Sequence, residues 1–593
     1  MNRHGEMVQS SAPVRGWIFA LSCFFAAAAS SAWADVPVIL PTAPTLPTFG
    51  STVYNVTVSN PNINGGTAAS TGTTNNATAI NAYITYCSNN GGGTVEVPTG
   101  LFKTGTLTLK SNVNLQVDSG ATLQTSSAGA TLITTSGSGL HDMGITGSGI
   151  LDGNASSATG NNLISVQNIN RLLISGVTIE NAGHEHLVPE KDTNVTISGI
   201  NINDHNSIIN TSNSTHTYLV NTDGIDYSGS NFLIQGCNIA DGDDDIVAKP
   251  ASTACNNIVI NNCTIYSGHG ISIGGGTAAG VSNMIVANCT FNPTGIGATD
   301  PTKNSVTYGL RMKAEDGNDP NQTQSGDVGG GVGHPLKNVK YININMTNVQ
   351  NPIAIESFYD GGDTFADSPN DTAFYTYGPT GTAARDVSNP NDSTMNQAPL
   401  WQNISYENVT ATGGTHILRI NGLNETTDPV NRPYANAIDG LSFSNVKLTG
   451  TSQMQLWYGA NIDLSGLTVT GTTESLYGLT NLTSTGVPLL PGDFNRDGSV
   501  NAADIPAMMS ALSDLSTYKA TYGLSDSQFE VIADLNNDFV FNNADVQAFL
   551  TLLQTGLGST SSVPEPGTFV LLAAGSGLIL LCRRRGKAFA GNR

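Results

Sequence analysis

The sequence predicts a right-handed parallel β-helix, an all-β solenoid, followed by a small α-helical domain that contains calcium loops. Three observations support this prediction. Only 11% of the 593 residues are charged, and Gly, Asn, Thr and Ser are abundant, a composition that favours short strands and tight turns. A pattern of alternating apolar residues recurs through the middle of the chain. Two loops rich in Asp and Asn, each followed by a helical segment, come near the C-terminal end.

The recurring pattern consists of an alternating strand, a turn and usually a second strand. Its copies begin at Arg171, Asn194, Asn231, Asn257 and Asn283, and later ones at Asn338, Asn403, Gly440 and Asn461. One copy cannot bury its apolar face alone, so we expect successive copies to stack as rungs. Cys237, Cys263 and Cys289 share one register and are expected to form an inward ladder of thiols. The segment 75–90 has apolar residues at helical spacing and is expected to cap the open end of the solenoid.

The two ends of the chain read as targeting segments. Arg3 and Arg15 precede an apolar run over 17–29, and Ala32-Trp33-Ala34 supplies small residues where a signal peptide is cleaved. That run is too short to span a membrane. The predicted divisions are 1–34 for the signal peptide, 35–50 for a Pro-rich spacer, 51–485 for the β-helix catalytic domain, 491–556 for the calcium-loop domain and 563–593 for a membrane or sorting tail.

The C-terminal tail has three parts, which are Val563-Pro564-Glu565-Pro566, an apolar run over 567–582 and a triple arginine over 583–585. It resembles the PEP-CTERM sorting signal of bacterial exported proteins, which implies processing by an exosortase-type enzyme. A plain C-terminal anchor is the alternative, and both place the body of the protein outside the cytoplasm. We therefore expect a secreted or cell-surface protein that meets the membrane only through this tail. The net charge of −22 argues against a nucleic-acid partner.

Polar residues at the starts of neighbouring strands fall in one register. Asp223, Asp244 and His269 each precede the first inward-facing isoleucine of their strand by two residues. Stacked rungs would bring these three side chains onto one line on the outside of the coil. On a further rung, alternation leaves Arg311 and Lys313 facing the same outside surface. The alternative interpretation is that all of these are solvated turn residues.

This set of side chains suits the hydrolysis of an acidic polysaccharide without a cofactor. Carboxylates held together, here Asp223, Asp243 and Asp244, raise the pKa of at least one of them, so a proton donor persists near neutral pH. Two carboxyl groups ~6.5–9.5 Å apart leave room for a water and define an inverting glycosidase. The two cations supply the positive charge that an acidic sugar needs in an anionic protein.

Four motifs in this order resemble those of the polygalacturonases, glycoside hydrolase family 28. They are Asn221-Thr222-Asp223-Gly224, Gly242-Asp243-Asp244, Gly268-His269-Gly270 and Arg311-x-Lys313, within a resemblance that spans roughly residues 50 to 480. The resemblance implies that Asp243 is the general acid, that Asp223 and Asp244 activate water, and that His269 assists the acid. It also implies that Asn221, Arg311, Lys313 and Tyr359 bind galacturonan, whose α-1,4 bonds would be hydrolysed with inversion.

Two departures from the family pattern leave details open. Asp245 stands where the family usually has Cys, so a local disulfide is lost and a carboxylate is added. Long loops over 316–334 and 360–398 could close part of the groove, which leaves endo and exo action open. The rival functions are a rhamnogalacturonan or xylogalacturonan hydrolase, a pectate lyase, and a non-catalytic β-helix that only binds polysaccharide. The histidine and the paired aspartates argue against the lyase.

The two acidic loops have the ligand spacing of calcium loops. The expected calcium ligands are Asp493, Asn495, Asp497, Ser499, Asn501 and Asp504 in the first loop, and Asp534, Asn536, Asp538, Val540, Asn542 and Asp545 in the second. Helices are predicted over 505–512 and 546–553. The two loop–helix units resemble a type I dockerin, which implies a cohesin-like partner. Phe539 occupies the sharp-turn position where Gly is expected, and two acidic turns without metal are the alternative.

Overall fold

The computed structural model describes residues 38, 40–156, 159–203, 209–210, 215–216, 221–293, 306–314, 334–357, 399–422, 438–451, 454–471, 474–483, 489–524 and 526–554. The predicted signal peptide, the sorting tail and Tyr359 lie outside the described residues. The described residues of the β-helix and of the helical module belong to one compact unit, which begins at Pro37.

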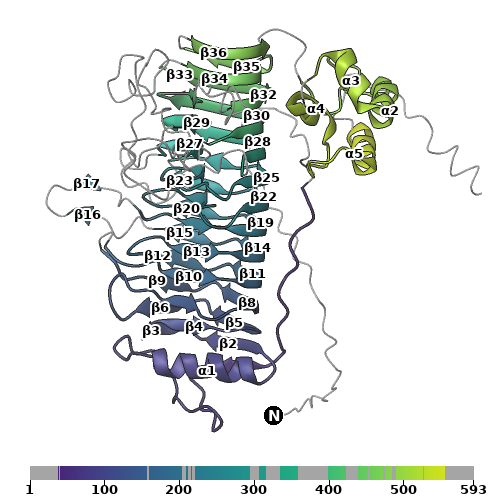
Figure 1. The fold of residues 1–593 in the computed structure, drawn as a ribbon. Helices are drawn as coiled ribbons and strands as arrows, with labels where there is room; N and C mark the ends of the chain where they lie inside the picture. The colour runs from purple at the N-terminus through teal and green to yellow at the C-terminus, as the bar shows by residue number, and fades with distance from the viewer. Residues whose placement is uncertain are drawn as a thin grey trace, which may run out of the picture. The chain divides into compact units, whose positions relative to one another are not determined.

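The central body is a parallel β-helix, as the repeats predict. Thirty-four described strands join one sheet by parallel pairing, and Figure 1 shows them stacked as successive rungs. The strands form three columns, because each rung contributes up to three strands that pair with the rungs before and after it.

The first column follows the repeated motif of the sequence. It contains β1 (Val53–Asn55), β2 (Gly93–Val97), β5 (Val113–Val117), β8 (Leu140–Gly147), β11 (Ile169–Ser175), β14 (Asp192–Ser198), β19 (Gly229–Gln235), β22 (Cys255–Asn261), β25 (Val281–Ala287), β28 (Leu336–Thr347), β30 (Trp401–Gly414), β32 (Ile438–Ser444), β34 (Met454–Asp463) and β36 (Glu474–Thr483).

The second column contains the short strands that follow each turn, and the last parts of β28 and β30 also pair with it. Its own strands are β3 (Gly100–Thr104), β6 (Ala121–Thr125), β9 (Ile150–Asp152), β12 (Thr178–Glu180), β15 (Asn201–Asn203), β20 (Asn238–Ala240), β23 (Thr264–Ser267), β26 (Thr290–Phe291), β33 (Val446–Gly450) and β35 (Leu467–Thr470).

The third column is the one that positions the polar motifs. It contains β4 (Leu107–Leu109), β7 (Ile133–Thr135), β10 (Ile164–Gln167), β13 (Leu187–Glu190), β18 (Ile225–Tyr227), β21 (Ile246–Ala248), β24 (Ile271–Ile273), β27 (Tyr308–Lys313), β29 (Asn351–Glu356) and β31 (Leu418–Asn421). A separate antiparallel pair joins β16 (Ile209–Asn210) and β17 (Thr215–His216).

An asparagine ladder explains why most copies of the repeat begin with Asn. Each of these asparagines has a positive φ of 55–58°, a left-handed conformation that Asn tolerates better than most residues. The side-chain Nδ2 of each asparagine donates to the side-chain Oδ1 of the asparagine one rung earlier. The members are Asn194, Asn231, Asn257, Asn283, Asn338 and Asn403. The repeat therefore fixes both the turn and the stacking of rungs.

The inside of the coil is a continuous apolar core. Inward residues such as Ile225, Ile246 and Ile271 are fully or almost fully buried. Cys237, Cys263 and Cys289 are buried free thiols in one register, as predicted. Buried cysteines that form no disulfide typically pack as small apolar side chains.

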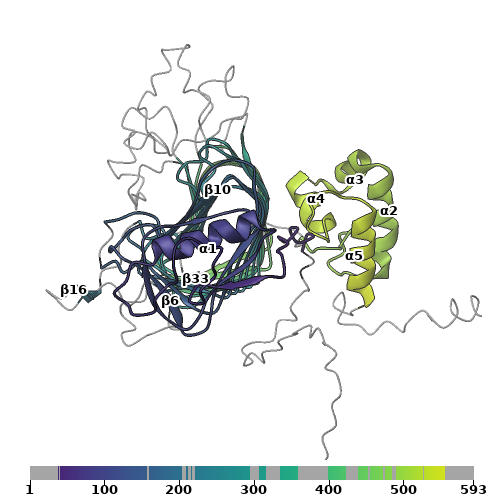
Figure 2. The ribbon, with the colours of Figure 1, turned by 90° about the horizontal axis from the view of Figure 1, so that it is seen from below.

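The predicted N-terminal cap is present as helix α1 (Ala77–Asn89). Its buried residues pack against the core of the coil; they are Ala79, Ile80, Tyr83, Ile84 and Cys87. Figure 2 shows α1 lying across the end of the coil. The helix therefore shields the apolar end that an open solenoid would expose.

The helical module has more helices than the sequence analysis predicted. It contains a 3₁₀ helix (Ala502–Asp504), α2 (Ile505–Ser513), α3 (Leu515–Tyr522), α4 (Asp526–Ala533) and α5 (Asn543–Gln554). Helices α2 and α5 follow the two acidic loops as expected. The additional helix α3 is capped by Asp514, which accepts the Thr517 N–H, and ends at Gly523 with φ 66°.

Candidate active site

Strand register brings the polar motifs together. Ile225 pairs with Ile246, Ile246 with Ile271, and Ile271 with Leu310, as the spacing predicts. The positions two residues earlier therefore form a column of their own. Its members are Asp223, Asp244, His269 and Tyr308. The His269 and Tyr308 rings meet edge to face, with centroids 5.7 Å apart.

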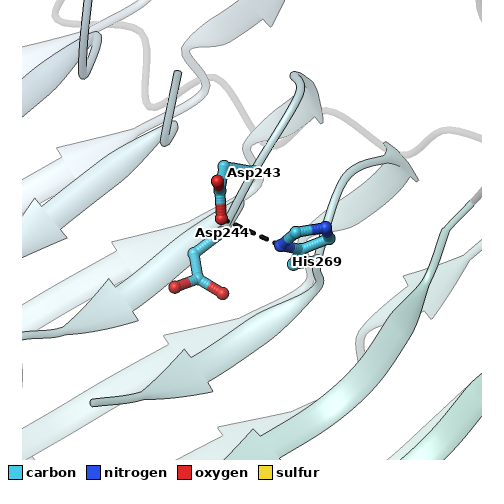
Figure 3. Close-up of side chains that lie close together, drawn as sticks. All are labelled: Asp243, Asp244 and His269. Carbon is cyan, nitrogen blue, oxygen red and sulfur yellow. Dashed lines mark hydrogen bonds and ion pairs between the residues drawn. The ribbon is translucent and has the colours of Figure 1, made fainter. Parts of the chain in front are cut away.

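Asp243 and His269 form one hydrogen-bonded pair. His269 Nδ1 lies 2.8 Å from Asp243 Oδ1, and Figure 3 shows the two side chains pointing toward one another beside Asp244. The Asn221 N–H donates to the other oxygen, Asp243 Oδ2, at 2.9 Å. Asn221 therefore contacts the proposed acid through its backbone.

The hydrogen bond decides where the proton of this pair resides. Burial raises the pKa of Asp243, but the hydrogen bond and charge of His269, together with the charge of Lys313, outweigh it and bring that pKa below its usual value. Burial lowers the pKa of His269, but the same bond and the negative charges of Asp243 and Asp244 together outweigh it and raise that pKa. Without substrate, the proton is held on His269 rather than on Asp243. Among Asp223, Asp243 and Asp244, the carboxyl whose pKa rises is Asp223, to about 6, through burial.

Asp244 is fully buried among groups that stabilise its charge. Lys313 Nζ lies 2.7 Å from its Oδ2, and the Ser272 hydroxyl donates to its Oδ1 at 2.8 Å. Burial raises the pKa of Asp244, but Lys313, Lys249 and Arg311 together hold it well below its usual range. Asp244 is therefore an anion that is ready to accept a hydrogen bond.

Arg311 lies deeper than its position on the outer face predicted. Its side chain is only 1% exposed, and its Nε donates to Glu356 Oε2 at 2.9 Å. Its guanidinium carbon lies 3.7 Å from the centre of the Tyr308 ring. Glu356 belongs to the next strand, β29, which pairs with β27 in register. The added rung therefore covers Arg311 and holds it in one orientation.

Lys249 is a functional candidate that the sequence analysis missed. It follows β21, and its Nζ lies 3.2 Å from Asp223 Oδ2 and 3.8 Å from Asp244 Oδ2. The strand register places Lys249, Gly274 and Lys313 in one column, three positions after the inward isoleucine or leucine. Applying the same register argument to the ends of the strands would have revealed this lysine.

Asp245 directly follows the Asp243-Asp244 pair, at the position where the resemblance leads one to expect Cys. It is fully buried, and its Oδ2 accepts the Gly270 N–H at 2.8 Å. Burial raises the pKa of Asp245 well above its usual value. The raised pKa favours the neutral form of this added carboxyl, and its hydrogen bond fixes the loop that carries His269.

Asp243, Asp244 and His269 have ligand atoms within 4.8 Å of one another, a spacing that a metal ion could use. The charges nearby argue against that role, because Lys313 and Lys249 already compensate Asp244. The same spacing is shorter than the ~6.5–9.5 Å between the carboxyl groups of a typical inverting pair. The separation of Asp243 and Asp244 therefore does not by itself indicate inversion.

The first acidic loop has the geometry of a calcium site. Asp493 and Asp504, its first and last expected ligands, are completely buried, and burial raises the pKa of both. Asp493 accepts the N–H groups of Asp497 and Gly498, and Gly498 has φ 84° as the sharp turn requires. Buried carboxylates directed into one loop suit a bound cation, so these residues fit calcium.

The second loop differs in the cation at its first residue: Asp493 of the first loop lies 3.6 Å from Arg496 of its own loop, whereas Asp534 contacts a buried lysine of the β-helix. Lys340 Nζ lies 2.5 Å from Asp534 Oδ2, and both side chains are 3% exposed. Phe539 adopts φ 62° at the turn where Gly is expected. Its ring lies 5.2 Å from Lys340 Nζ. A strand residue of the β-helix thus supplies the positive charge that calcium would bring to Asp534.

Comparisons with known proteins agree with this fold. Residues 87–373 match glycosyl hydrolases family 28, and residues 562–585 match the PEP-CTERM protein-sorting motif. No curated protein matches the sequence. A family 28 exopolygalacturonase from Yersinia enterocolitica is 18% identical, with a TM-score of 0.52, and the match covers 74% of this chain and 79% of that one. A hyperthermoactive exopolygalacturonase from Thermotoga maritima is 19% identical, with a TM-score of 0.50 over 73% of this chain and 94% of that one.

The fold and the matched residues define this protein as a glycoside hydrolase built on a right-handed parallel β-helix. More particularly, it carries a glycosyl hydrolases family 28 domain and a C-terminal PEP-CTERM motif. The sorting motif indicates export to the bacterial cell surface and processing by an exosortase. Of the helices in the described part of the chain, none is long and apolar enough to cross a membrane.

Proposed function

We propose that this protein is a polygalacturonase that hydrolyses the α-1,4 bonds of pectic galacturonan with inversion. The observation that supports this most directly is the grouping of the Asp243–His269 pair with Asp223, Asp244 and Lys313 on adjacent rungs. This grouping combines a proton donor, two water-binding carboxylates and a cation for an acidic sugar. Membership of the family 28 domain supports the broader class of pectin hydrolysis.

The acid step uses the proton shared by Asp243 and His269. As the glycosidic bond breaks, its oxygen receives this proton through Asp243, while His269 gives up the hydrogen on Nδ1. The Asn221 N–H holds Asp243 Oδ2, so the carboxyl keeps one orientation during the transfer. Positioning of this kind lowers the barrier because the donor does not need to reorganise.

The water step uses Asp223 and Asp244. Lys249 contacts an oxygen of each, which supports a role for the two as a pair. A water held between them would attack the anomeric carbon from the face opposite the leaving oxygen, which inverts the configuration. Asp223, with a pKa of about 6, is the member of the pair that is protonated first on acidification, and activity is expected to fall with its protonation.

Recognition of the sugar carboxylate is assigned to Lys313, with Arg311 behind it. Lys313 forms an ion pair with Asp244 in the free protein, so in the complex Lys313 would contact both Asp244 and the carboxylate of the sugar. Arg311 is held by Glu356 and Tyr308 and acts by adding positive potential to the floor of the site. Tyr359, outside the described residues, stays a predicted substrate contact.

Digestion of polygalacturonate, with rhamnogalacturonan and xylogalacturonan in parallel, tests the proposal. We expect reducing ends from polygalacturonate, first as the β-anomer by NMR, with no absorbance from unsaturated uronate. Product lengths over time separate endo from exo action. Unsaturated products would indicate a lyase, early α-anomer a retaining enzyme, and preference for a decorated backbone a different pectin hydrolase.

We also propose that residues 491–556 form a calcium-binding, dockerin-like module with a cohesin-like partner. The buried ligand carboxylates of the first loop support calcium there. Calcium bound by oxygen ligands would neutralise these carboxylates and order the loop. The proposed divisions stay those of the sequence analysis, with a signal peptide at 1–34, a spacer at 35–50 and a catalytic domain at 51–485.

A further inference from the structure

Lys249 is placed at the centre of the carboxylates that the proposed reaction needs. Its Nζ lies 3.2 Å from Asp223 Oδ2, 3.7 Å from Asp226 Oδ2 and 3.8 Å from Asp244 Oδ2. The three carboxylate side chains are at most 8% exposed, whereas the lysine side chain is 32% exposed. One partly exposed lysine therefore contacts three buried acids through its ammonium group.

Two buried carboxylates that bind one water need positive charge between them. Ionised carboxylates accept the water's hydrogen bonds most strongly, and one of them must be ionised to take up its proton, but the mutual repulsion of two anions opposes this state. Lys313 compensates Asp244 at 2.7 Å, but the proposed function assigns Lys313 to the sugar carboxylate as well. Lys249 is the cation in contact with Asp223.

The fold holds the two lysines in one column with a glycine between them. Lys249, Gly274 and Lys313 occupy equivalent positions on successive rungs. A Cβ at Gly274 would lie 1.7 Å from the Lys313 carbonyl oxygen and 3.1 Å from Lys313 Cγ, and Gly274 has φ 109°. A side chain is therefore excluded from the position between the two lysines.

We propose that Lys249 is a positioning residue that keeps Asp223 and Asp244 ionised together, so that both can hold the attacking water. This inference rests on the proposed hydrolytic function. It assigns the two lysines different tasks, with Lys313 shared between Asp244 and the substrate, and Lys249 dedicated to the water-binding acids.

The charges around Asp223 agree with this role. Burial raises the pKa of Asp223, Lys249 is the largest influence that lowers it, and Asp243 and Asp244 raise it. Lys313 lowers that pKa further, and Asp226 is the remaining acid near Lys249. Burial lowers the pKa of Lys249, but Asp226, Asp223, Asp244 and Asp243 outweigh it, so the lysine stays charged.

The first test compares Lys249→Met with Lys249→Arg and with the exposed control Lys337→Met. In Lys249→Met, the acidic limb of kcat/KM should move up by about one pH unit, because a contact charge is lost. Activity should fall about tenfold below the limb and recover at higher pH, with KM nearly unchanged. Lys249→Arg and Lys337→Met should keep the wild-type limb. An unmoved limb would overturn the proposal, and an unmoved limb with a raised KM would identify Lys249 as a sugar-binding residue instead.

The second test needs no substrate, so it separates this inference from the proposed function. Asp223→Asn is introduced into the wild-type and Lys249→Met backgrounds, and melting temperatures are measured at pH 4 and pH 7. At pH 7, the change in melting temperature caused by Asp223→Asn should be more favourable in the Lys249→Met background than in wild type. In that background the substitution removes a buried charge that has lost its partner. At pH 4, where Asp223 is protonated in both, the difference should vanish. Additive effects at pH 7 would refute the charge coupling, and Lys249→Gln serves as the neutral variant if Lys249→Met does not fold.

Discussion

Replacing Asp243 with Asn tests the acid step most directly, because the structure indicates that the change preserves the local geometry. The Asn carbonyl oxygen can accept the Asn221 N–H that Asp243 Oδ2 accepts now, at 2.9 Å. The Asn amide can donate to His269 Nδ1, now 2.8 Å from Asp243 Oδ1, once the imidazole is neutral. The variant therefore keeps its hydrogen bonds but has no proton to deliver.

The size of the expected loss follows from the chemistry of the pair. General acid catalysis by a positioned group contributes roughly 10²–10⁴-fold, which corresponds to about 3–5 kcal/mol of activation free energy. We expect kcat of Asp243→Asn to fall by this factor with KM nearly unchanged, because the acid acts mainly in the transition state. The pKa of His269 should also fall toward its usual value, since the bond to Asp243 is what raises it.

The assay is steady-state hydrolysis of polygalacturonate by wild type and Asp243→Asn across pH, with melting temperatures as the control for folding. A loss of kcat below tenfold in a folded variant would refute the assignment of Asp243 as the proton donor. A loss that appears in KM alone would show that Asp243 binds the sugar instead.

Three other predictions follow from the same charges and contacts. The wild-type kcat/KM profile should be bell-shaped, with an acidic limb near pH 6 from Asp223 and an alkaline limb above the ordinary histidine pKa from His269. His269→Gln should remove the alkaline limb, and a limb that persists would exclude His269 as its source. Lys313→Met should raise KM and also move the acidic limb upward, because Lys313 compensates Asp244; a raised KM with an unmoved limb would contradict the second role. Calorimetric titration should find one strong calcium site that Asp493→Ala removes, and Lys340→Met should add a second by releasing Asp534; two equal sites in wild type would contradict the lysine contact.

The β-helix and the column of acids could be predicted because a stacked fold converts sequence spacing into position. Once Ile225, Ile246 and Ile271 are recognised as equivalent inward residues, every offset from them defines a line along the coil. The offset of minus two gave Asp223, Asp244 and His269, and the structure confirms that register. The spacing alone therefore predicted that these three positions line up on three successive rungs.

Interactions between different offsets could not be predicted in this way. Lys249 lies three positions after its isoleucine and Asp223 two before, so their contact depends on how a long side chain folds back across the strand. Arg311 was placed on the outer face, but its burial depends on Glu356 of the following rung. A pattern along one strand carries no information about a partner that a later rung supplies.

The protonation of the site shows why spacing and electrostatics have to be considered together. Proximity alone predicts that crowded carboxylates raise a pKa, and proton donation suggests that the raised one is Asp243. The structure instead gives Asp243 an imidazole and Asp244 two lysines, which lower their pKa values, and the rise falls on Asp223. Because Lys249 is the largest influence that limits that rise, we expect the acidic boundary of activity to depend on a lysine that none of the four recognised motifs contains.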